Sequence, residues 1–213
     1  MSDTQIKAGA MSTFDRVISY YRGNWIIDVG CNIGMFIECV LERFPGASVL
    51  GFEPVKRHYD EARKLFANKG NVYLENYAVG DSDSEETIFV AKNNIGWNTM
   101  VGEMVDDDNR TSIQKVHTIC FDKYWDYTGL DVKVDIVKID VEGYEYKVLN
   151  GMRRFLKDQR PTIICEIGWG KNHPHWDEEL KAFEYLYSIG YSRENEEEIL
   201  NLSCTKDFLF RSI

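Results

Sequence analysis

The sequence predicts an α/β protein built on an open, mostly parallel sheet of seven strands with helices on both faces. Short apolar runs alternate with stretches whose apolar residues recur at helical spacing. The first two runs each end in an acid, Asp28 and Glu53. A turn containing Gly30 and Gly34 joins the first run to a helical stretch. The apolar runs cover residues 25–27, 49–52, 134–139 and 162–167.

The first third of the chain predicts two strand–helix units after a helical lead-in at residues 1–24. The lead-in is expected to cover the site at the glycine turn. The helix after Gly34 should stop at Pro45-Gly46. Pro54 suits the first turn of the next helix, which should end before Gly70. A third strand is then expected over residues 71–77.

The middle of the chain has a different character. Residues 81–118 contain charged turns and two short strand-like runs, at 87–91 and 116–119, and no long helix fits there. We therefore expect residues 81–133 to be a β-hairpin insertion that shapes the substrate pocket. No linker composition brackets the segment, so residues 1–213 are predicted to form a single domain.

The last third returns to the parallel pattern. It predicts strands at 134–140 and 162–167 with a helix at 144–156 between them. The following helix should bury Leu180, Phe183, Leu186 and Tyr187 and end at Gly190. A closing hairpin is expected from strands at 199–202 and 208–210.

Charge and composition exclude several classes of partner. The net charge is −10 and no basic run is present, which disfavours nucleic acid and anionic membranes. No apolar stretch approaches the roughly 20 residues that a membrane-spanning helix needs. Five cysteines without paired spacing are typical of reduced thiols, so we expect a cytoplasmic protein. The oligomeric state is not predicted.

The glycine turn suggests a nucleotide-like ligand. A dinucleotide-binding turn would need glycine at positions 30, 32 and 35, where this chain has Gly30, Asn32 and Met35. A phosphate-binding Gly-Lys-Ser/Thr sequence is also absent. The spacing Asp28-x-Gly30-x-x-x-Gly34 instead resembles motif I of S-adenosylmethionine methyltransferases. There, the acid before the turn can meet the ammonium group of the ligand.

Four longer stretches extend this resemblance to the FkbM family of S-adenosylmethionine-dependent methyltransferases. They are IIDVGCNIG, GFEP, NYAVGD and DIVKIDVEGYEYKVLNGM, with a weaker match at PTIICEIG. The DVEGYE segment is the most family-specific, and the matches lie between Trp25 and Gly168. The resemblance implies a Rossmann-like class I methyltransferase fold and O-methylation of sugars or natural-product scaffolds. The segment NNIGWNTM stands where relatives usually carry a serine-rich stretch. This difference bears on the identity of the acceptor and not on the reaction.

The residues expected to hold the cofactor lie in the glycine turn and at the strand ends. Glu53 should bind the ribose hydroxyls, and residues 76–79 should line the adenine. The full set is Asp28, Gly30, Cys31, Asn32, Gly34, Phe36, Glu53, Pro54, Asn76, Tyr77, Ala78 and Asp140.

The candidate catalytic residues are Asp140, Glu142 and His173, all near the expected position of the transferred methyl group. A carboxylate or histidine there can remove the proton of an acceptor hydroxyl. Alternatively, Asp140 binds the cofactor's ammonium group. A divalent metal held by Asp140, Glu142 and a histidine is conceivable, but no ligand spacing requires it, so no metal ligand is assigned. Lys138, inside an apolar strand, should pair with a carboxylate.

The candidate acceptor residues lie in loops around the same edge of the sheet: Trp97, Asn98, Glu166, Trp169 and His175. Tryptophan planes suit the apolar faces of sugar rings. The resemblance implies an O-methyltransferase, and together with these tryptophans it predicts a sugar or glycan hydroxyl as the acceptor. The alternatives are an amine or non-sugar natural product as acceptor, a non-catalytic cofactor-binding module, and an NAD-linked oxidoreductase, which the missing glycines disfavour.

Overall fold

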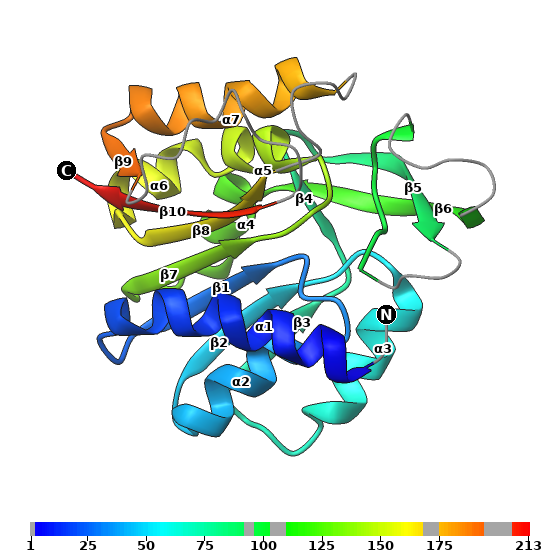
Figure 1. Ribbon diagram of the computed structural model, residues 1–213, viewed down its shortest axis with the longest axis horizontal. Coiled ribbons are helices and arrows are strands. Elements are labelled where there is room, and N and C mark those ends of the chain that lie inside the picture. The colour runs from blue at the N-terminus through cyan, green and yellow to red at the C-terminus, as the bar shows by residue number, and fades with distance from the viewer. Residues whose placement is uncertain (1–2, 92–95, 103–109, 168–174, 194–205) are drawn as a thin grey trace.

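Seven strands form the central sheet in the order β3-β2-β1-β7-β8-β10-β9. The computed structural model describes residues 3–91, 96–102, 110–167, 175–193 and 206–213 (Figure 1). All neighbours from β3 to β8 are parallel, whereas β10 runs antiparallel to both β8 and β9. The predicted seven-stranded, mostly parallel sheet is thus confirmed. The strands are β1 (Trp25–Val29), β2 (Ser48–Phe52), β3 (Val72–Glu75), β7 (Val134–Ile139), β8 (Thr162–Ile167), β9 (Tyr191–Arg193) and β10 (Lys206–Ser212).

Helices cover both faces of this sheet, because the central strands are apolar on both sides. Successive residues point to opposite faces, so Ile26 packs into the core beneath α1 (Asp3–Val17) and α2 (Met35–Arg43). Its neighbour Ile27 packs into the opposite core, with α4 (Phe121–Thr128), α5 (Glu145–Gly151), α6 (Arg153–Gln159) and α7 (Trp176–Ser188). Figure 1 shows α5, α6 and α7 on one side of the sheet and α1 and α2 on the other. Among the described residues, no helix combines the length and apolar character needed to cross a membrane.

A second sheet of three strands lies beyond the carboxyl ends of the central strands (Figure 1). It is formed by β4 (Ala78–Gly80), β5 (Ser84–Ala91) and β6 (Arg110–Cys120), with β6 in the middle. β5 and β6 form the antiparallel pair that the short runs indicated, although both strands are longer than those runs. β4 belongs to this sheet rather than continuing β3, and α4 follows β6 directly. The segment 81–133 therefore contains a helix as well as strands.

Two predictions about the last third need correction. The helix expected at 144–156 is two helices that meet at Met152. The backbone at Gly151, beside this break, packs closely against Gly80. A Cβ at residue 151 would overlap the carbonyl group of Gly80, so glycine is needed there. Tyr187 is 42% exposed rather than inward, since Tyr185 and Leu186 face the core instead. The closing hairpin pairs β10 with β9, and the strand expected at 199–202 lies outside the described residues.

Candidate active site

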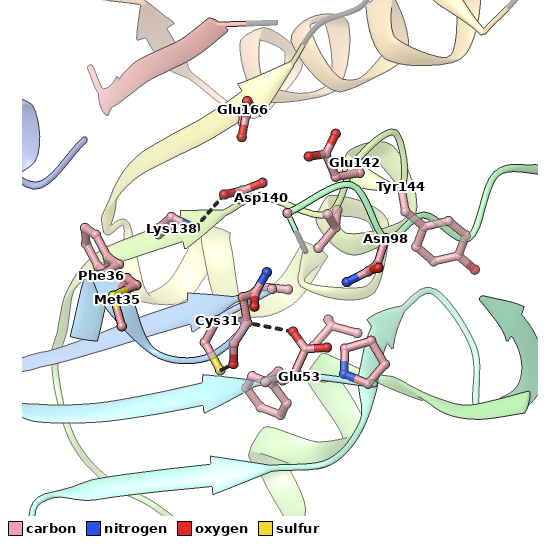
Figure 2. Close-up of a pocket in the computed structure, with 18 of the residues that line it drawn as sticks. Cys31, Met35, Phe36, Glu53, Asn98, Lys138, Asp140, Glu142, Tyr144 and Glu166 are labelled. Carbon is pink, nitrogen blue, oxygen red and sulfur yellow. Dashed lines mark hydrogen bonds and ion pairs between the residues drawn. The ribbon is translucent and has the colours of Figure 1, made fainter. Parts of the chain in front are cut away.

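A cavity of about 410 Å³ opens at the carboxyl ends of β1, β2 and β7. β2 lies on one side of β1 and β7 on the other, so the strand order changes direction at β1. Ligands bind at such switch points in open α/β sheets. Its wall combines the turn after β1, the ends of β2, β7 and β8, the segment 96–100 and residues of α1. Figure 2 shows Asp140 between Glu166 and Glu53 in this cavity.

The turn after β1 comes unusually close to the end of β7. Gly30 has a φ of 81°, and a Cβ there would overlap the backbone carbonyl oxygen of Asp140. The amide of Asp140 donates to the carbonyl of Val29 at 3.0 Å, which ties the two strand ends together. Only glycine tolerates both the backbone conformation and this approach. The turn thereby leaves room for a ligand beside the N-terminus of α2.

The acid at the end of β2, Glu53, is 5% exposed and lines the cavity. Its two carboxylate oxygens accept backbone hydrogen bonds from Asn32 at 2.9 Å and Val55 at 2.8 Å. Burial raises the pKa of Glu53 to about 7, despite these two bonds. His58 Nδ1 lies 4.0 Å from the Glu53 carboxylate. The backbone bonds fix the carboxylate in one orientation, with lone pairs left for a ligand's hydroxyl groups.

Three carboxyl groups gather at the ends of β7 and β8. Oxygens of Asp140, Glu142 and Glu166 lie within 4.8 Å of one another. Although burial opposes it, Lys138 lowers the pKa of Asp140, and a hydrogen bond from Glu166 contributes. The negative charge of Asp140, together with burial, strongly raises the pKa of Glu166. Burial and then Asp140 raise the pKa of Glu142. Lys138 thus favours the charged form of Asp140, whereas burial and the crowding of the three groups disfavour the charged forms of Glu142 and Glu166.

Lys138 is the buried counter-charge of this group. Its ammonium lies 2.9 Å from Asp140 and 3.5 Å from Asp28, and the residue is 7% exposed. Burial alone would lower the pKa of Lys138, but these two carboxylates raise it above its ordinary value. The predicted pairing of Lys138 with a carboxylate is therefore present. Asp28 itself is fully buried behind Lys138 and does not line the cavity.

The turn after Asp140 is held by a residue whose role the sequence did not indicate. The Glu145 carboxylate accepts hydrogen bonds from the amides of Val141 and Gly143, both at 3.2 Å. Glu142 between them has a φ of 52°, a left-handed conformation that non-glycine residues rarely adopt. Glu145 thereby fixes the turn from which Glu142 enters the cavity. An acid in the first turn of a helix, here α5, is the only local signal for such a role.

The segment 96–101 forms the wall next to the second sheet. Trp97, Asn98 and Met100 line the cavity, and Trp97 remains 43% exposed. The Asn98 side-chain amide lies 3.2 Å from Nδ1 of His58 and accepts from the amide of Ala91 at 3.0 Å. Thr99 donates through its hydroxyl to the carbonyl of Glu142. The segment is thus attached both to the Glu53 side of the cavity and to the carboxyl group around Asp140.

Four of the expected site residues do not line the cavity. Asp28 pairs with Lys138, and Gly34 faces the ring of Phe66 at the start of α2. The Asn76 amide donates to the backbone carbonyls of Glu53 and Pro54 and so supports the cavity from behind. Nε2 of His175 lies 2.8 Å from the carbonyl of Gly143. His173 and Trp169 lie outside the described residues.

The other expected residues are brought together around one cavity: Gly30, Cys31, Asn32, Phe36, Glu53, Pro54, Tyr77, Ala78, Trp97, Asn98, Asp140, Glu142 and Glu166. Sequence reasoning missed Thr13 and Asp207, which also line it and share a hydrogen bond of 2.7 Å. They are 194 residues apart, so no local pattern signals the contact. Arg16 donates to the Asp207 carbonyl at 2.7 Å, which further joins α1 to β10.

Comparison with known proteins identifies the family. Residues 28–187 match the model described as "Methyltransferase FkbM domain", and the chain belongs to this family of S-adenosylmethionine-dependent methyltransferases. A curated relative, "Methyltransferase 1" of Beauveria bassiana (strain ARSEF 2860), is 26% identical over 161 residues, covering 68% of this chain and 64% of the relative. The chain thus spans less than two thirds of that relative's length.

Two solved structures are similar in fold. One is the methyltransferase FkbM of Methylobacillus flagellatus KT, with a TM-score of 0.57 and 14% identity over 99% of this chain and 55% of that one. The other is Aeropyrum pernix fibrillarin with natively bound S-adenosyl-L-methionine, with a TM-score of 0.55 and 12% identity over 95% and 75%. At these identities the likeness concerns the class I methyltransferase fold alone.

The residues at the cavity fit S-adenosylmethionine. The missing Cβ of Gly30 leaves the backbone open, and the buried Glu53 carboxylate retains free lone pairs for a diol. The carboxylate of Asp140 suits the positive charge that the cofactor carries on its sulfonium and ammonium groups. The donor set therefore agrees with the cofactor that the family uses.

Proposed function

We propose that this protein transfers a methyl group to a hydroxyl oxygen of a sugar or glycan. The observation that carries the proposal is Asp140, a carboxylate held deprotonated by Lys138 at 2.9 Å on the cavity wall. When bound, S-adenosylmethionine supplies an electrophilic methyl group on a sulfonium. Asp140 would accept the proton of the acceptor hydroxyl as its oxygen attacks. Glu142 and Glu166 would hold neighbouring hydroxyls of the acceptor.

For the cofactor, we assign the ribose to Glu53 and the adenine to Tyr77 and Ala78, which line the cavity beside it. Gly30, Cys31 and Asn32 would follow the methionine part with their backbone. Asp28 was expected to contact the cofactor, but it does not line the cavity. We propose instead that it orients Lys138 from the buried side. Phe36 supports this placement of Lys138, whose ammonium lies 5.7 Å from the centre of the Phe36 ring.

We propose that the segment 81–133 shapes the acceptor side of the cavity. The described residues that carry this are Ile88 of β5 and Trp97, Asn98 and Met100 of the segment 96–101, all of which line the cavity. A half-exposed indole beside carboxyl groups suits a sugar ring, which has an apolar face and hydroxyl edges. In the sequence that follows β8, His173 stays a proposed alternative base and Trp169 a proposed acceptor contact. His175, expected at the acceptor, is instead proposed to support the turn at Gly143, whose carbonyl its Nε2 approaches to 2.8 Å.

A metal-assisted mechanism is the alternative for the same residues. Asp140, Glu142 and Glu166 offer oxygen ligands, which suit Mg²⁺ or Ca²⁺. The third ligand would then be Glu166 rather than the histidine expected from the sequence. Lys138 favours the metal-free scheme, because it already balances the charge of Asp140. Methyl transfer to glycosides, measured by release of S-adenosylhomocysteine with EDTA and with added Mg²⁺, tests both schemes. Equal rates support the carboxylate base, whereas no transfer to any glycoside contradicts the proposed function.

The proposed setting is the cytoplasm, without nucleic acid as a substrate. The described cysteines Cys31, Cys39, Cys120 and Cys165 are free thiols, which suits a reducing compartment. The net charge of −10 disfavours a polyanionic partner. Methylation of total cellular RNA by the purified protein would contradict the second proposal.

Glu53→Gln is expected to weaken S-adenosylhomocysteine binding by roughly 10- to 100-fold, because the charge-assisted hydrogen bonds to the ribose diol are lost. The pKa of Glu53 is raised to about 7 by burial, so the carboxylate form is lost as the pH falls through that value. Affinity of the unaltered protein should therefore drop between pH 8 and pH 6, and that of the variant should change less. Calorimetric titration at both pH values measures this.

The 2′-deoxy analogue of S-adenosylhomocysteine provides the matched control for Glu53. The unaltered protein should bind it more weakly than the parent compound, and Glu53→Gln should largely abolish the difference. If the variant discriminates between the two ligands as well as the unaltered protein does, Glu53 does not bind the ribose.

A further inference from the structure

We infer that the acceptor is an uncharged polyol, such as a simple glycoside, and carries no phosphate, sulfate or carboxylate group. This inference rests on the proposed function and specifies the substrate class of the same cavity. It excludes nucleotide-linked sugars, sugar phosphates and uronic acids as acceptors. Two observations support it: the carboxyl groups that line the cavity, and the ion pairs that already occupy Lys138, the one cation among the described lining residues.

The described wall of the cavity is strongly acidic. One ammonium group, that of Lys138, faces five carboxyl groups along the described part of the lining. Three of the carboxyl groups surround the position proposed for the acceptor hydroxyl, within 4.8 Å of one another. Glu53 lies on the cofactor side and Asp207 near α1. The five acids are Glu53, Asp140, Glu142, Glu166 and Asp207.

Lys138 is not available to an anionic acceptor. Its ammonium already contacts Asp140 at 2.9 Å and Asp28 at 3.5 Å, and the residue is 7% exposed. A phosphate that approached Lys138 would also approach Asp140, since the two lie side by side at the end of β7 (Figure 2). Arg16 of α1 is bound to Asp207 and does not line the cavity. The described wall therefore offers no free positive group to a ligand anion.

The carboxyl groups beside the acceptor position are crowded together. Oxygens of Asp140, Glu142 and Glu166 lie within 4.8 Å of one another, and all three line the cavity. An anionic group on the acceptor would enter the same space and meet like charge there. Like charges about 6 Å apart near a protein surface interact strongly enough to weaken binding by roughly 100-fold. A neutral acceptor avoids this cost.

The same groups suit a neutral polyol. The oxygens of Asp140, Glu142 and Glu166 can all accept hydrogen bonds from hydroxyl groups. Adjacent hydroxyls on a sugar ring supply the donors that such a set of acceptors needs. Trp97 lines the same cavity and leaves 43% of its surface exposed for an apolar ring face.

The test is a panel of matched acceptors measured as kcat/KM for methyl transfer at low ionic strength. Methyl glycosides of glucose, mannose, galactose and rhamnose are compared with the 6-phosphates of the first three, with methyl glucuronide and with UDP-glucose. We expect the best neutral glycoside to exceed the best anionic sugar by roughly 100-fold or more. The ratio should shrink as salt is added, because screening weakens the repulsion.

Glu142→Gln gives a second readout that does not depend on overall activity. Because the ratio of kcat/KM for neutral and anionic acceptors is taken within one variant, a general loss of rate cancels. The ratio should fall several-fold in Glu142→Gln, because an amide cannot carry any of the negative charge that the three neighbouring carboxyl groups share. It should stay unchanged in Glu85→Gln, the same substitution at an exposed position on β5. An unchanged ratio in both variants would contradict the role of this carboxyl group.

The outcomes separate the two proposals. A phosphorylated or carboxylated sugar methylated as well as its neutral counterpart overturns the inference and leaves sugar O-methylation standing. Methylation of amines or of a short oligoribonucleotide, with no sugar accepted, overturns both. Methylation confined to neutral glycosides supports both.

Discussion

Asp140→Asn is expected to lower kcat for methyl transfer by about 100- to 10,000-fold, the usual contribution of a general base. The amide keeps the size of the side chain but cannot accept a proton from the acceptor hydroxyl. It also retains an oxygen that can face Lys138, so the local structure should persist. Affinity for S-adenosylhomocysteine should change little. Single-turnover rates and calorimetric titration of the same preparation measure the two effects separately.

Comparing the loss of rate with the loss of cofactor affinity in Asp140→Asn distinguishes the two possible roles of Asp140. A rate loss without an affinity loss assigns it to proton removal. Equal losses in both would place Asp140 on the cofactor's ammonium group instead, which was the alternative left open by the sequence. Glu85→Gln on the exposed edge of β5 serves as the control and should alter neither quantity.

Lys138→Met is expected to destabilise the fold by about 3–5 kcal/mol, the usual effect of removing one partner from a buried ion pair. Methionine fills the space of the lysine stem, but Asp28, fully buried, loses its only charged neighbour of opposite sign among the described contacts. Urea denaturation should show the loss as a lower midpoint. Lys147→Met is the control: this exposed partner of Asp81 should contribute less than about 1 kcal/mol.

The Lys138→Met variant should also depend on pH in a specific direction. Burial already raises the pKa of Asp28 above its ordinary value in the folded protein, and loss of the ammonium should raise it further. The pKa of Asp140, which Lys138 lowers, should rise as well. The folded state then binds protons more tightly, so its stability falls as the pH rises from about 5 to 8. The double variant Asp28→Asn, Lys138→Met should recover part of the stability at pH 8. No recovery would show that the buried charge is not the cause of the loss.

The fold was largely predictable because its strands are local patterns. The run Val134–Ile139 is apolar at every position except Asp135 and Lys138. A parallel sheet buries both faces of such runs. The split at Met152 was not predictable, because the periodicity continues through it. The break lies beside a close approach of Gly151 to Gly80, a contact between distant parts of the chain that no local pattern signals.

The site was predictable where residues stand at strand ends, and less so where partners come from elsewhere. Glu53, Asp140 and Glu166 follow from topology, since parallel strands bring their carboxyl ends to one edge. Asp28 was expected at the ligand because it follows the apolar run 25–27, yet its carboxylate lies 3.5 Å from the ammonium of the buried Lys138. The direction of a single side chain at a strand end depends on its neighbour in register, Lys138, which the sequence of β1 does not contain.

Methyl transfer to oxygen at the Asp140 cavity can be measured directly on the product. The most direct measurement is carbon NMR of the product formed from S-adenosylmethionine labelled with ¹³C in its methyl group, using the best acceptor of the glycoside panel. We expect a single new signal in the O-methyl region that correlates with a ring carbon of the sugar, and none from Asp140→Asn on the same timescale. A signal in the N-methyl region, or an undiminished O-methyl signal from the variant, would contradict the account.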